Sequence, residues 1–228
     1  MKKSDLVAPE RYNIVEEIEK YAVDTSKQAI AYEDDQGNTD SITYANLIKN
    51  ANKIGHVFSN HGLQKGDKVL IMMPRSIITY EIYTAALKLG LVIIPSSEML
   101  RTKDLQHRIT HGDVAAVVVI NEGVNEFKDI AEYDNLTKFI VGGYEDNWIN
   151  IEDEQQQASD ELDIVATHRD DIALLSYTSG TTAKPKAVVH THGWGYAHMQ
   201  TAPKYWLSVN EGDTAWATAA PGLSLIHI

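Results

Sequence analysis

The hydrophobic pattern changes its period along the first half of the chain. In residues 43–62, apolar positions recur every three or four residues, which is typical of an amphipathic helix. Thr43 is suited to cap the start of this helix, and Gly62 is suited to end it. A continuous apolar run then occupies residues 68–73, which is the pattern of a strand buried on both faces.

This alternation of helix and strand patterns continues along the chain. A strand, a helix and a second strand within residues 68–95 indicate a βαβ unit and therefore a parallel sheet. We predict an α/β fold with parallel-rich sheets flanked by helices. The further helices are predicted at residues 76–90, 100–112 and 125–131, the further strands at 91–95, 114–120, 138–142 and 171–177, and a short strand leading into a helix at 187–200.

Residues 144–163 interrupt the pattern. Eight of these residues are acidic and the glutamines cluster, so we predict a solvated connection with a frayed turn or strand inside it. The acidic run from Glu152 to Asp163 is interpreted as solvent-exposed surface.

Composition narrows the class of protein. The 228 residues carry a formal net charge of −12, which disfavours nucleic acid as a partner. The absence of cysteine excludes disulfides, thiolate metal sites and cysteine nucleophiles. Apolar runs are far shorter than the roughly 20 residues that span a bilayer, so we expect a cytoplasmic protein with no integral membrane segment.

A segment rich in hydroxyl groups follows the strand predicted at residues 171–177. It reads Thr-Ser-Gly-Thr-Thr-Ala-Lys-Pro-Lys over residues 178–186. Glycine lets a loop turn its N–H groups toward an anion, hydroxyls add donors, and lysine adds positive charge. The segment lacks the spacing of the G-x-x-x-x-G-K-[ST] phosphate loop. Two interpretations stay open on composition alone: a nucleotide phosphate site, or a polar turn with solvated lysines.

The stretch YTSGTTAKPKAVVHTH, residues 177–192, closely resembles the phosphate-binding signature of the adenylate-forming superfamily. That superfamily includes acyl-CoA synthetases, luciferases and the adenylation domains of peptide synthetases. Ala183 and Ala187 stand where its signature has glycine. Residues 42–47 and 62–100 are similar to earlier family blocks, with Asn46 at a position where glutamate is usual.

The segment DTAWATAAPG, residues 213–222, is similar to the family block after the signature. Its Trp216-Ala-Thr218-Ala219 core favours the acetyl and medium-chain acyl-CoA synthetases over the luciferases. Two departures are Ala220 in place of an aspartate and Leu223 in place of a tryptophan.

The resemblance implies a ligase that uses Mg·ATP and coenzyme A. A short- or medium-chain carboxylate would attack the α-phosphate to give acyl-AMP, and coenzyme A would then displace AMP to give the thioester. The alternatives are an aryl- or amino-acid-activating ligase of the same superfamily, or a non-catalytic remnant. The residues carried over to the β- and γ-phosphates of ATP are Thr178, Ser179, Gly180, Thr181, Thr182, Lys184 and Lys186.

The resemblance also implies a domain organisation. Residues 1–222 would form part of the N-terminal AMP-binding domain, and residues 223–228 a foreign or truncated tail. The family's C-terminal domain, with its catalytic lysine, would be absent. We therefore expect no adenylation activity from these residues alone, and the sequence leaves the oligomeric state undetermined.

Other residue types that can carry chemistry occur near the chain's hydroxyl-rich segment and elsewhere. His190 and His192 would face one side of a strand, as a metal-ligand pair does, but with no third ligand in the sequence we interpret them as packing or loop polarity. Arg101 and Lys103 are interpreted as ordinary surface charges. Four aromatic residues could line an acyl pocket: Trp194, Tyr196, Tyr205 and Trp206. We expect at least two of them to be core residues instead. His198 and Met199 lie where an acyl tail could pass.

Overall fold

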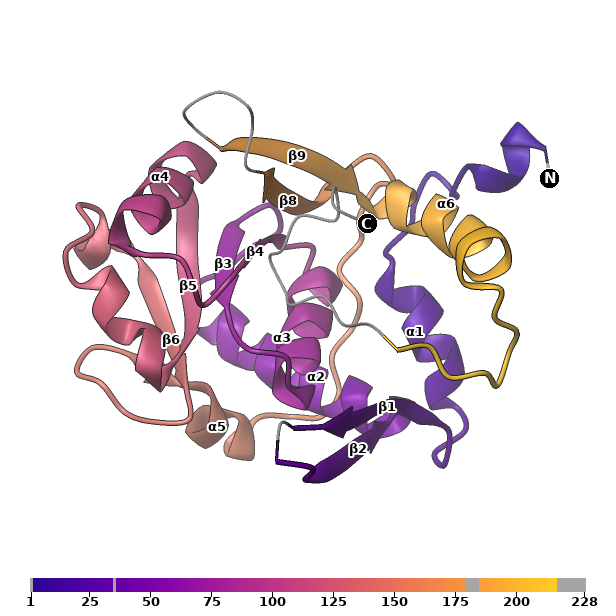
Figure 1. The fold of residues 1–228 in the computed structure, drawn as a ribbon, viewed down its shortest axis with the longest axis horizontal. Coiled ribbons are helices and arrows are strands. Elements are labelled where there is room, and N and C mark those ends of the chain that lie inside the picture. The colour runs from indigo at the N-terminus through magenta and orange to yellow at the C-terminus, as the bar shows by residue number, and fades with distance from the viewer. Residues whose placement is uncertain (1, 35, 179–184, 217–228) are drawn as a thin grey trace.

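The fold is built on a seven-stranded sheet (Figure 1). The structure is a computed structural model that describes residues 2–34, 36–178 and 185–216. The strand order is β7-β6-β5-β3-β4-β8-β9, and all neighbouring strands run parallel except β8 and β9. The strands are β3 (Lys68–Met72), β4 (Val92–Ser96), β5 (Val114–Ile120), β6 (Thr137–Val141), β7 (Ile149–Asn150), β8 (Ile172–Thr178) and β9 (Lys186–Thr191).

Helical segments cover both faces of the sheet, as expected for parallel strands with continuous apolar runs. Helices α2 (Tyr44–Asn60), α3 (Ile77–Lys88) and α5 (Ile151–Glu154) pack on one face. Helix α4 (Thr102–Gly112) and the 3-10 segment η2 (Asn121–Phe127) pack on the other.

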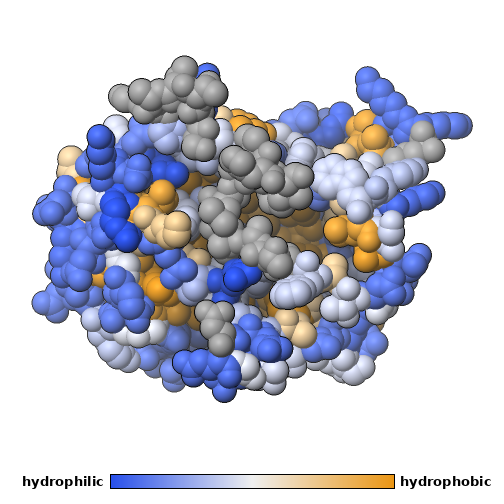
Figure 2. All heavy atoms as spheres, viewed as in Figure 1, coloured by the Kyte–Doolittle hydropathy of each residue, from blue (hydrophilic) through white to orange (hydrophobic). Residues whose placement is uncertain are grey.

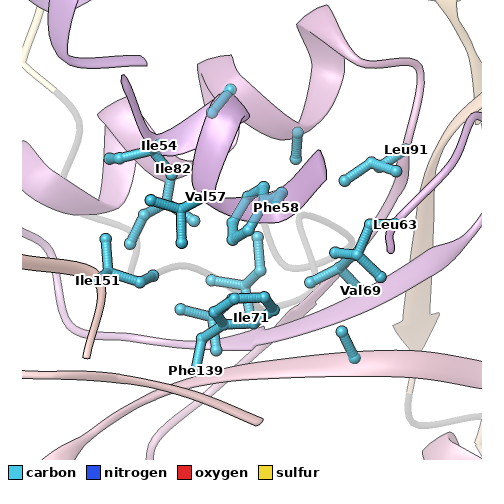
Figure 3. Close-up of a cluster of buried hydrophobic side chains, with 14 of the residues drawn as sticks. Ile54, Val57, Phe58, Leu63, Val69, Ile71, Ile82, Leu91, Phe139 and Ile151 are labelled. Atoms are coloured by element: carbon cyan, nitrogen blue, oxygen red, sulfur yellow. The ribbon is translucent and has the colours of Figure 1, made fainter. Parts of the chain in front are cut away.

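The side chains of β3 alternate between these two layers. Val69 and Ile71 join the cluster under α2 and α3, whereas Leu70 and Met72 join the cluster under α4. Figure 3 shows the first cluster, in which Phe58 of α2 lies edge-on to Phe139 of β6 with ring centroids 5.0 Å apart. The core therefore lies in two layers, one on each side of the sheet.

The N-terminal residues form a smaller unit beside the sheet. Helix α1 (Val15–Ala22) packs against α2, and β1 (Gln28–Glu33) pairs with β2 (Thr39–Thr43) as an antiparallel hairpin. The remaining short segments are the 3-10 turns η1 (Lys3–Leu6), η3 (Tyr133–Asn135) and η4 (Gln155–Gln157), helix α6 (His192–Ala202) and the π-helical turn η5 (Pro203–Leu207).

The sequence predictions for the central elements are confirmed. The strand predicted at 114–120 is β5 with the same bounds, and the helix predicted at 43–62 is α2. The Thr43 hydroxyl accepts a hydrogen bond from the Asn46 N–H at 3.2 Å, and Gly62 has a φ of +87°. The helix predicted at 125–131 is wrong, because residues 125–127 are the end of the 3-10 segment η2 (Asn121–Phe127) and the residues after it form turns.

Residues 144–163 are more ordered than predicted. Ile151 is fully buried under α2 and Trp148 is 8% exposed, while most of the acidic side chains face solvent as expected. The Asn52 amide donates to the Asp160 carbonyl at 2.7 Å, and His56 Nε2 lies 2.8 Å from the Glu161 carbonyl oxygen. The segment therefore returns along α2 from the β7 edge of the sheet.

Hydrophilic residues line the margin of the face shown in Figure 2, and apolar residues show between them toward its middle. Across the described ranges, none of the helices combines the length and the apolar character needed to cross a bilayer.

Candidate functional site

Strand β8 brings the hydroxyl-rich segment to the carboxyl edge of the parallel sheet. It runs parallel to β4 and ends at Thr178, which is half-buried. Strand β9 begins at Lys186 and returns antiparallel, so that the Cα atoms of Lys186 and Thr178 are register partners. Ligands of open α/β sheets bind at this edge. Of the predicted phosphate site, Ser179, Gly180, Thr181, Thr182 and Lys184 lie outside the described residues.

Lys186 is exposed at the start of β9. The next residue, Ala187, is half-buried and packs on the core cluster under α4. Because side chains alternate along a strand, this packing of Ala187 turns Lys186 away from that core. The Lys186 ammonium group is thus available to an anion beside Thr178, at the end of the β8–β9 hairpin where β8 ends and β9 begins.

Helix α4 packs against the end of the β8–β9 hairpin that carries Tyr177 and Pro185. Tyr177 of β8 is 6% exposed, and the Arg108 guanidinium lies 5.3 Å from the centre of its ring. His111 Nδ1 is 2.8 Å from the Tyr177 hydroxyl, and His107 Nε2 is 3.2 Å from the carbonyl oxygen of Pro185. The sequence interpretation did not include these α4 residues. The feature that could have indicated them is a pair of histidines four positions apart on the helix that precedes the strand β5.

Burial changes the acidity of two of these groups. Desolvation raises the pKa of the Tyr177 phenol, and the Arg108 guanidinium partly opposes that increase. Desolvation also lowers the pKa of Arg108, against the influence of Asp104 and Tyr177. Tyr177 therefore stays a neutral phenol beneath the hairpin at physiological pH.

Gly112 permits the close approach of α4 to β4 and β8. A Cβ atom at this position would lie 2.9 Å from Ile94 Cδ1 and 3.3 Å from the Tyr177 hydroxyl. Any larger residue would push the end of α4 away from the strand that carries Thr178.

A crevice of about 360 Å³ opens at the carboxyl ends of β3 and β5. Consecutive connections leave these two strands in opposite directions, so the crevice lies at the switch point of the sheet. Burial, and then the nearby Glu122 carboxylate, raise the pKa of Glu98. Three carboxylates and one guanidinium make the crevice unfavourable for a triphosphate. It is lined by Met72, Glu98, Arg101, Ile120, Glu122, Gly123 and Glu126.

The surface interpretation of Arg101 and Lys103 agrees with the structure. Both side chains are exposed, and Arg101 Nε lies 3.7 Å from a carboxylate oxygen of Glu126. Neither residue lies in the β8–β9 hairpin.

His190 and His192 do not share a strand face, contrary to the prediction. His190 lies in β9, whereas His192 is the first residue of α6. The His192 ring is fully buried, and its Nδ1 accepts a hydrogen bond from the Ile14 N–H at 3.2 Å. Burial lowers the pKa of His192 to about 4. The pair therefore packs in two different environments, which agrees with a packing role.

The expectation that at least two of the four aromatic candidates are core residues is wrong for the described chain. Only Tyr196 is half-buried, edge-on to Tyr12 with ring centroids 5.4 Å apart. Trp194, Tyr205 and Trp206 are 41%, 56% and 71% exposed.

His198 and Met199 are both half-buried on α6. The His198 ring stacks on Trp194, with ring centroids 5.0 Å apart, and contacts Trp206 edge-on at 5.1 Å. This places His198 within a surface row of aromatic rings; a contact with an acyl tail stays a prediction.

Within the part of the chain that the structure describes, no three His, Asp or Glu side chains are grouped to hold a metal ion. Mg²⁺ in nucleotide sites is held largely by substrate phosphates and water, with one or two protein ligands. The Thr178 hydroxyl at the hairpin base fits that role, and Mg²⁺ would supply charge neutralisation at the phosphates.

These features define a doubly wound α/β protein in which a hydroxyl- and lysine-rich stretch of sequence connects β8 to β9 at the carboxyl edge of the sheet. Residues 19–226 match the model of a family described as AMP-binding enzyme. The chain belongs to this family of adenylate-forming enzymes.

Its relatives include acyl-CoA ligases. The chain is 44% identical over 222 residues to the uncharacterized acyl-CoA ligase YtcI of Bacillus subtilis, covering 97% of this chain and 42% of that protein. It is 33% identical to the acetyl-coenzyme A synthetase of the same organism, over 91% of this chain and 37% of that protein. The chain therefore spans less than half the length of these relatives.

A solved structure gives the same result for the fold. The crystal structure of ATP-bound MatB from Rhodopseudomonas palustris matches with a TM-score of 0.73 at 27% identity, over 86% of this chain and 38% of that one. The predicted α/β class and the partial N-terminal domain of the adenylate-forming fold are confirmed by these matches.

Proposed function

We propose that the chain is the phosphate-binding part of an acid–thiol ligase. This ligase activates a short- or medium-chain carboxylic acid with ATP and transfers the acyl group to coenzyme A. The observation that carries the proposal is the position of the segment 178–186, which joins the end of β8 to the start of β9 at the carboxyl edge of the sheet. Similarity to acyl-CoA ligases and to the acetyl-coenzyme A synthetase supports the acyl substrate class.

The residues of the hairpin would act on the leaving group. When a carboxylate attacks the α-phosphate, negative charge moves onto the departing pyrophosphate. The Lys186 ammonium group, together with the hydroxyls of the segment, would hold the β- and γ-phosphates and stabilise that charge. The Thr178 hydroxyl, fixed by β8, would donate to a phosphate oxygen or share the metal ion. A cytoplasmic location accompanies this proposal, because ATP and coenzyme A are both available there.

Binding of tripolyphosphate and ATP tests the phosphate site. Replacement of Lys186 by glutamine removes one charge-assisted hydrogen bond of about 1.5–3 kcal/mol, so we expect roughly tenfold or greater loss of affinity. The matched control is Lys103→Gln, which makes the same change in net charge at an exposed lysine outside the hairpin. Isothermal titration calorimetry provides the affinities, and the shift of the melting temperature by ATP provides an independent measure. Equal affinities for the two variants and the wild type would contradict the proposed role of Lys186.

Turnover is a separate question. The chain spans 42% of the length of its relative YtcI, and we expect no pyrophosphate release from these residues alone with ATP and a panel of short, medium-chain and aryl carboxylates. Robust turnover would refute this expectation, and the preferred carboxylate would then decide between the aliphatic and aryl alternatives.

A further inference from the structure

A row of aromatic rings leads from the edge strand β9 to the turn after α6. His190 of β9 lies 4.3 Å from Trp194 of α6, measured between ring centroids. Trp194 stacks on His198, and His198 in turn meets Trp206 of η5 edge-on. Figure 1 shows β9 at the edge of the sheet, running into α6. The row therefore joins three successive elements into one surface.

Much of this surface is exposed, although its side chains are apolar or aromatic. Trp206 is 71% exposed, and Trp194 and Val188 are each 41% exposed. Val188 lies two positions before His190 on β9, so these two side chains are on the same side of the strand. Monomeric proteins rarely leave several such side chains uncovered in one continuous patch. We call this patch the aromatic face; it consists of Val188, His190, Trp194, His198 and Trp206.

The charge pattern separates the aromatic face from the rest of the surface. The chain carries 32 acidic residues and a net charge of −12, yet residues 186–210 contain no Asp or Glu. The cores of protein interfaces are also depleted in acidic residues and enriched in aromatic ones. Burial, and then the nearby His198, lower the pKa of His190, so that its ring is neutral at physiological pH. The aromatic face therefore has the composition of an interface core.

The strand β9 adds a backbone edge beside the aromatic face. It is the last strand in the order of the sheet, and it pairs with β8 along one side. None of the strands that the structure describes occupies its other side. Alternate residues of an antiparallel strand direct their N–H and C=O groups away from the paired neighbour. An extended segment of another element can pair with these groups.

We propose that the β9 edge and the aromatic face form one docking surface, and that its partner is the remaining part of an adenylate-forming ligase. The match to YtcI covers 97% of this chain but only 42% of that protein, so more than half of YtcI lies outside the matched region. The partner presents a strand to β9 and apolar side chains to the aromatic rings. The inference rests on membership of the family and not on the phosphate site.

The charge of the chain argues against a second copy as the partner. Two molecules that each carry a net charge of −12 repel each other as they approach. The docking surface is also formed by β9, α6 and η5, which are the last strand and helical elements of the described chain. A segment that follows them in a longer relative would lie next to this surface.

Association of two separate chains tests the docking surface. The 228-residue chain is co-expressed with the unmatched part of YtcI, which carries an affinity tag, and the Kd of the purified pair is measured by sedimentation. Trp206→Ser and Val188→Lys should raise this Kd roughly 30-fold or more, as substitutions at an interface hot spot do. The matched controls are Tyr144→Ser and Val23→Lys, because these residues are 74% and 88% exposed outside the docking surface. Both controls should stay within about 2-fold of the wild type.

A linked chain decides the case in which the two parts do not co-purify. It consists of residues 1–222 followed by the unmatched part of YtcI, and its hydrogen exchange is compared with that of the 228-residue chain. We expect exchange over residues 186–207 to slow by roughly tenfold or more, with the β1–β2 hairpin at residues 28–43 unchanged. Equal exchange over residues 186–207 in the two proteins would overturn the inference.

Two other results would also overturn it. The first is an equal Kd for the wild type, Trp206→Ser and Val188→Lys. The second is a stable dimer of the 228-residue chain alone that Trp206→Ser dissociates, because a second copy would then cover the aromatic face. Tripolyphosphate binding is measured on the same proteins, and its absence in the wild type would contradict the proposed function alone.

Discussion

The buried ammonium group of Lys88 provides a sharp test of the fold. Lys88 lies at the end of α3 with a side chain only 2% exposed. Its Nζ is 2.6 Å from Glu19 Oε1 on α1 and 2.6 Å from Asn52 Oδ1 on α2. This one charge therefore joins three helices, and its carboxylate partner Glu19 is 33% exposed. We predict that Glu19→Ala is more destabilising than Lys88→Met.

The magnitude follows from the two possible ways of breaking this pair. Glu19→Ala leaves a positive charge buried without a counter-charge, which costs about 3–5 kcal/mol in the free energy of unfolding. Lys88→Met replaces the charge by an apolar chain of similar length, so that the loss should stay below about 2 kcal/mol. At roughly 2–4 °C per kcal/mol for a chain of this size, Glu19→Ala should lower the melting temperature by roughly 10 °C.

Urea unfolding followed by circular dichroism provides the free energies, with the melting temperature as a second measure. The matched control is Glu145→Ala, because Glu145 is also 33% exposed and its partner Lys128 lies 3.0 Å away but is 45% exposed. An exposed pair contributes about 0–1 kcal/mol. If Glu19→Ala and Glu145→Ala are destabilised equally, the burial of Lys88 does not determine the cost and the reasoning is wrong.

Two further predictions concern stability. Burial lowers the pKa of His192 from 6.5 to about 4, so the folded state loses stability as the pH falls below about 6.5. This loss of stability amounts to about 2 kcal/mol by about pH 5. His192→Asn keeps an acceptor for the Ile14 N–H and should remove this loss from the pH dependence of the free energy of unfolding in urea. An unchanged pH dependence in that variant would contradict the lowered pKa of His192. Thr43→Ala should destabilise the chain by about 1 kcal/mol in the same assay, through loss of the cap on the Asn46 N–H, whereas Thr43→Ser should retain most of that stability; equal losses would argue against the cap.

The central sheet was predictable because its strands are buried on both faces. Residues 114–120 form a continuous apolar run, and the polar residues Asp113 and Asn121 on either side mark where the strand β5 begins and ends. The hairpin β1–β2 has no such signal, since β1 is nowhere fully buried. Strand β1 mixes exposed and half-buried positions, and β2 has three exposed positions before the buried Ile42, so neither strand has a pattern that separates it from a loop.

The direction of β9 could have been predicted and was not. Parallel neighbours need a crossover of about a dozen residues or more, and only residues 179–185 separate β8 from β9. This short connection permits only an antiparallel pair. The error over 125–131 has a different cause, because η2 and the turns after it bury Val124, Phe127 and Ile130 at a spacing close to three, which resembles a helix in the sequence.

The residue types of the site were predictable, but the support beneath it was not. The order of hydroxyls, glycine and lysines in residues 178–186 is a local feature of the sequence. His107 and His111 occupy polar positions of an amphipathic helix, where histidine usually faces water. Their contacts with Pro185 and Tyr177 exist only because α4 crosses beneath the end of the hairpin.

The two histidines of β9 and α6 show how one local signal decides a chemical interpretation. A metal-ligand pair requires that His190 and His192 lie on one strand, with their side chains on the same side. Thr191 instead accepts a hydrogen bond from the Trp194 N–H at 3.2 Å and begins α6, so the strand ends between the two histidines. Threonine three positions before a free backbone donor is a helix N-cap pattern, and in this chain it separates His192, buried against Ile14, from His190 beside Trp194. The hydroxyl of one threonine therefore turns an apparent ligand pair into two unrelated packing residues.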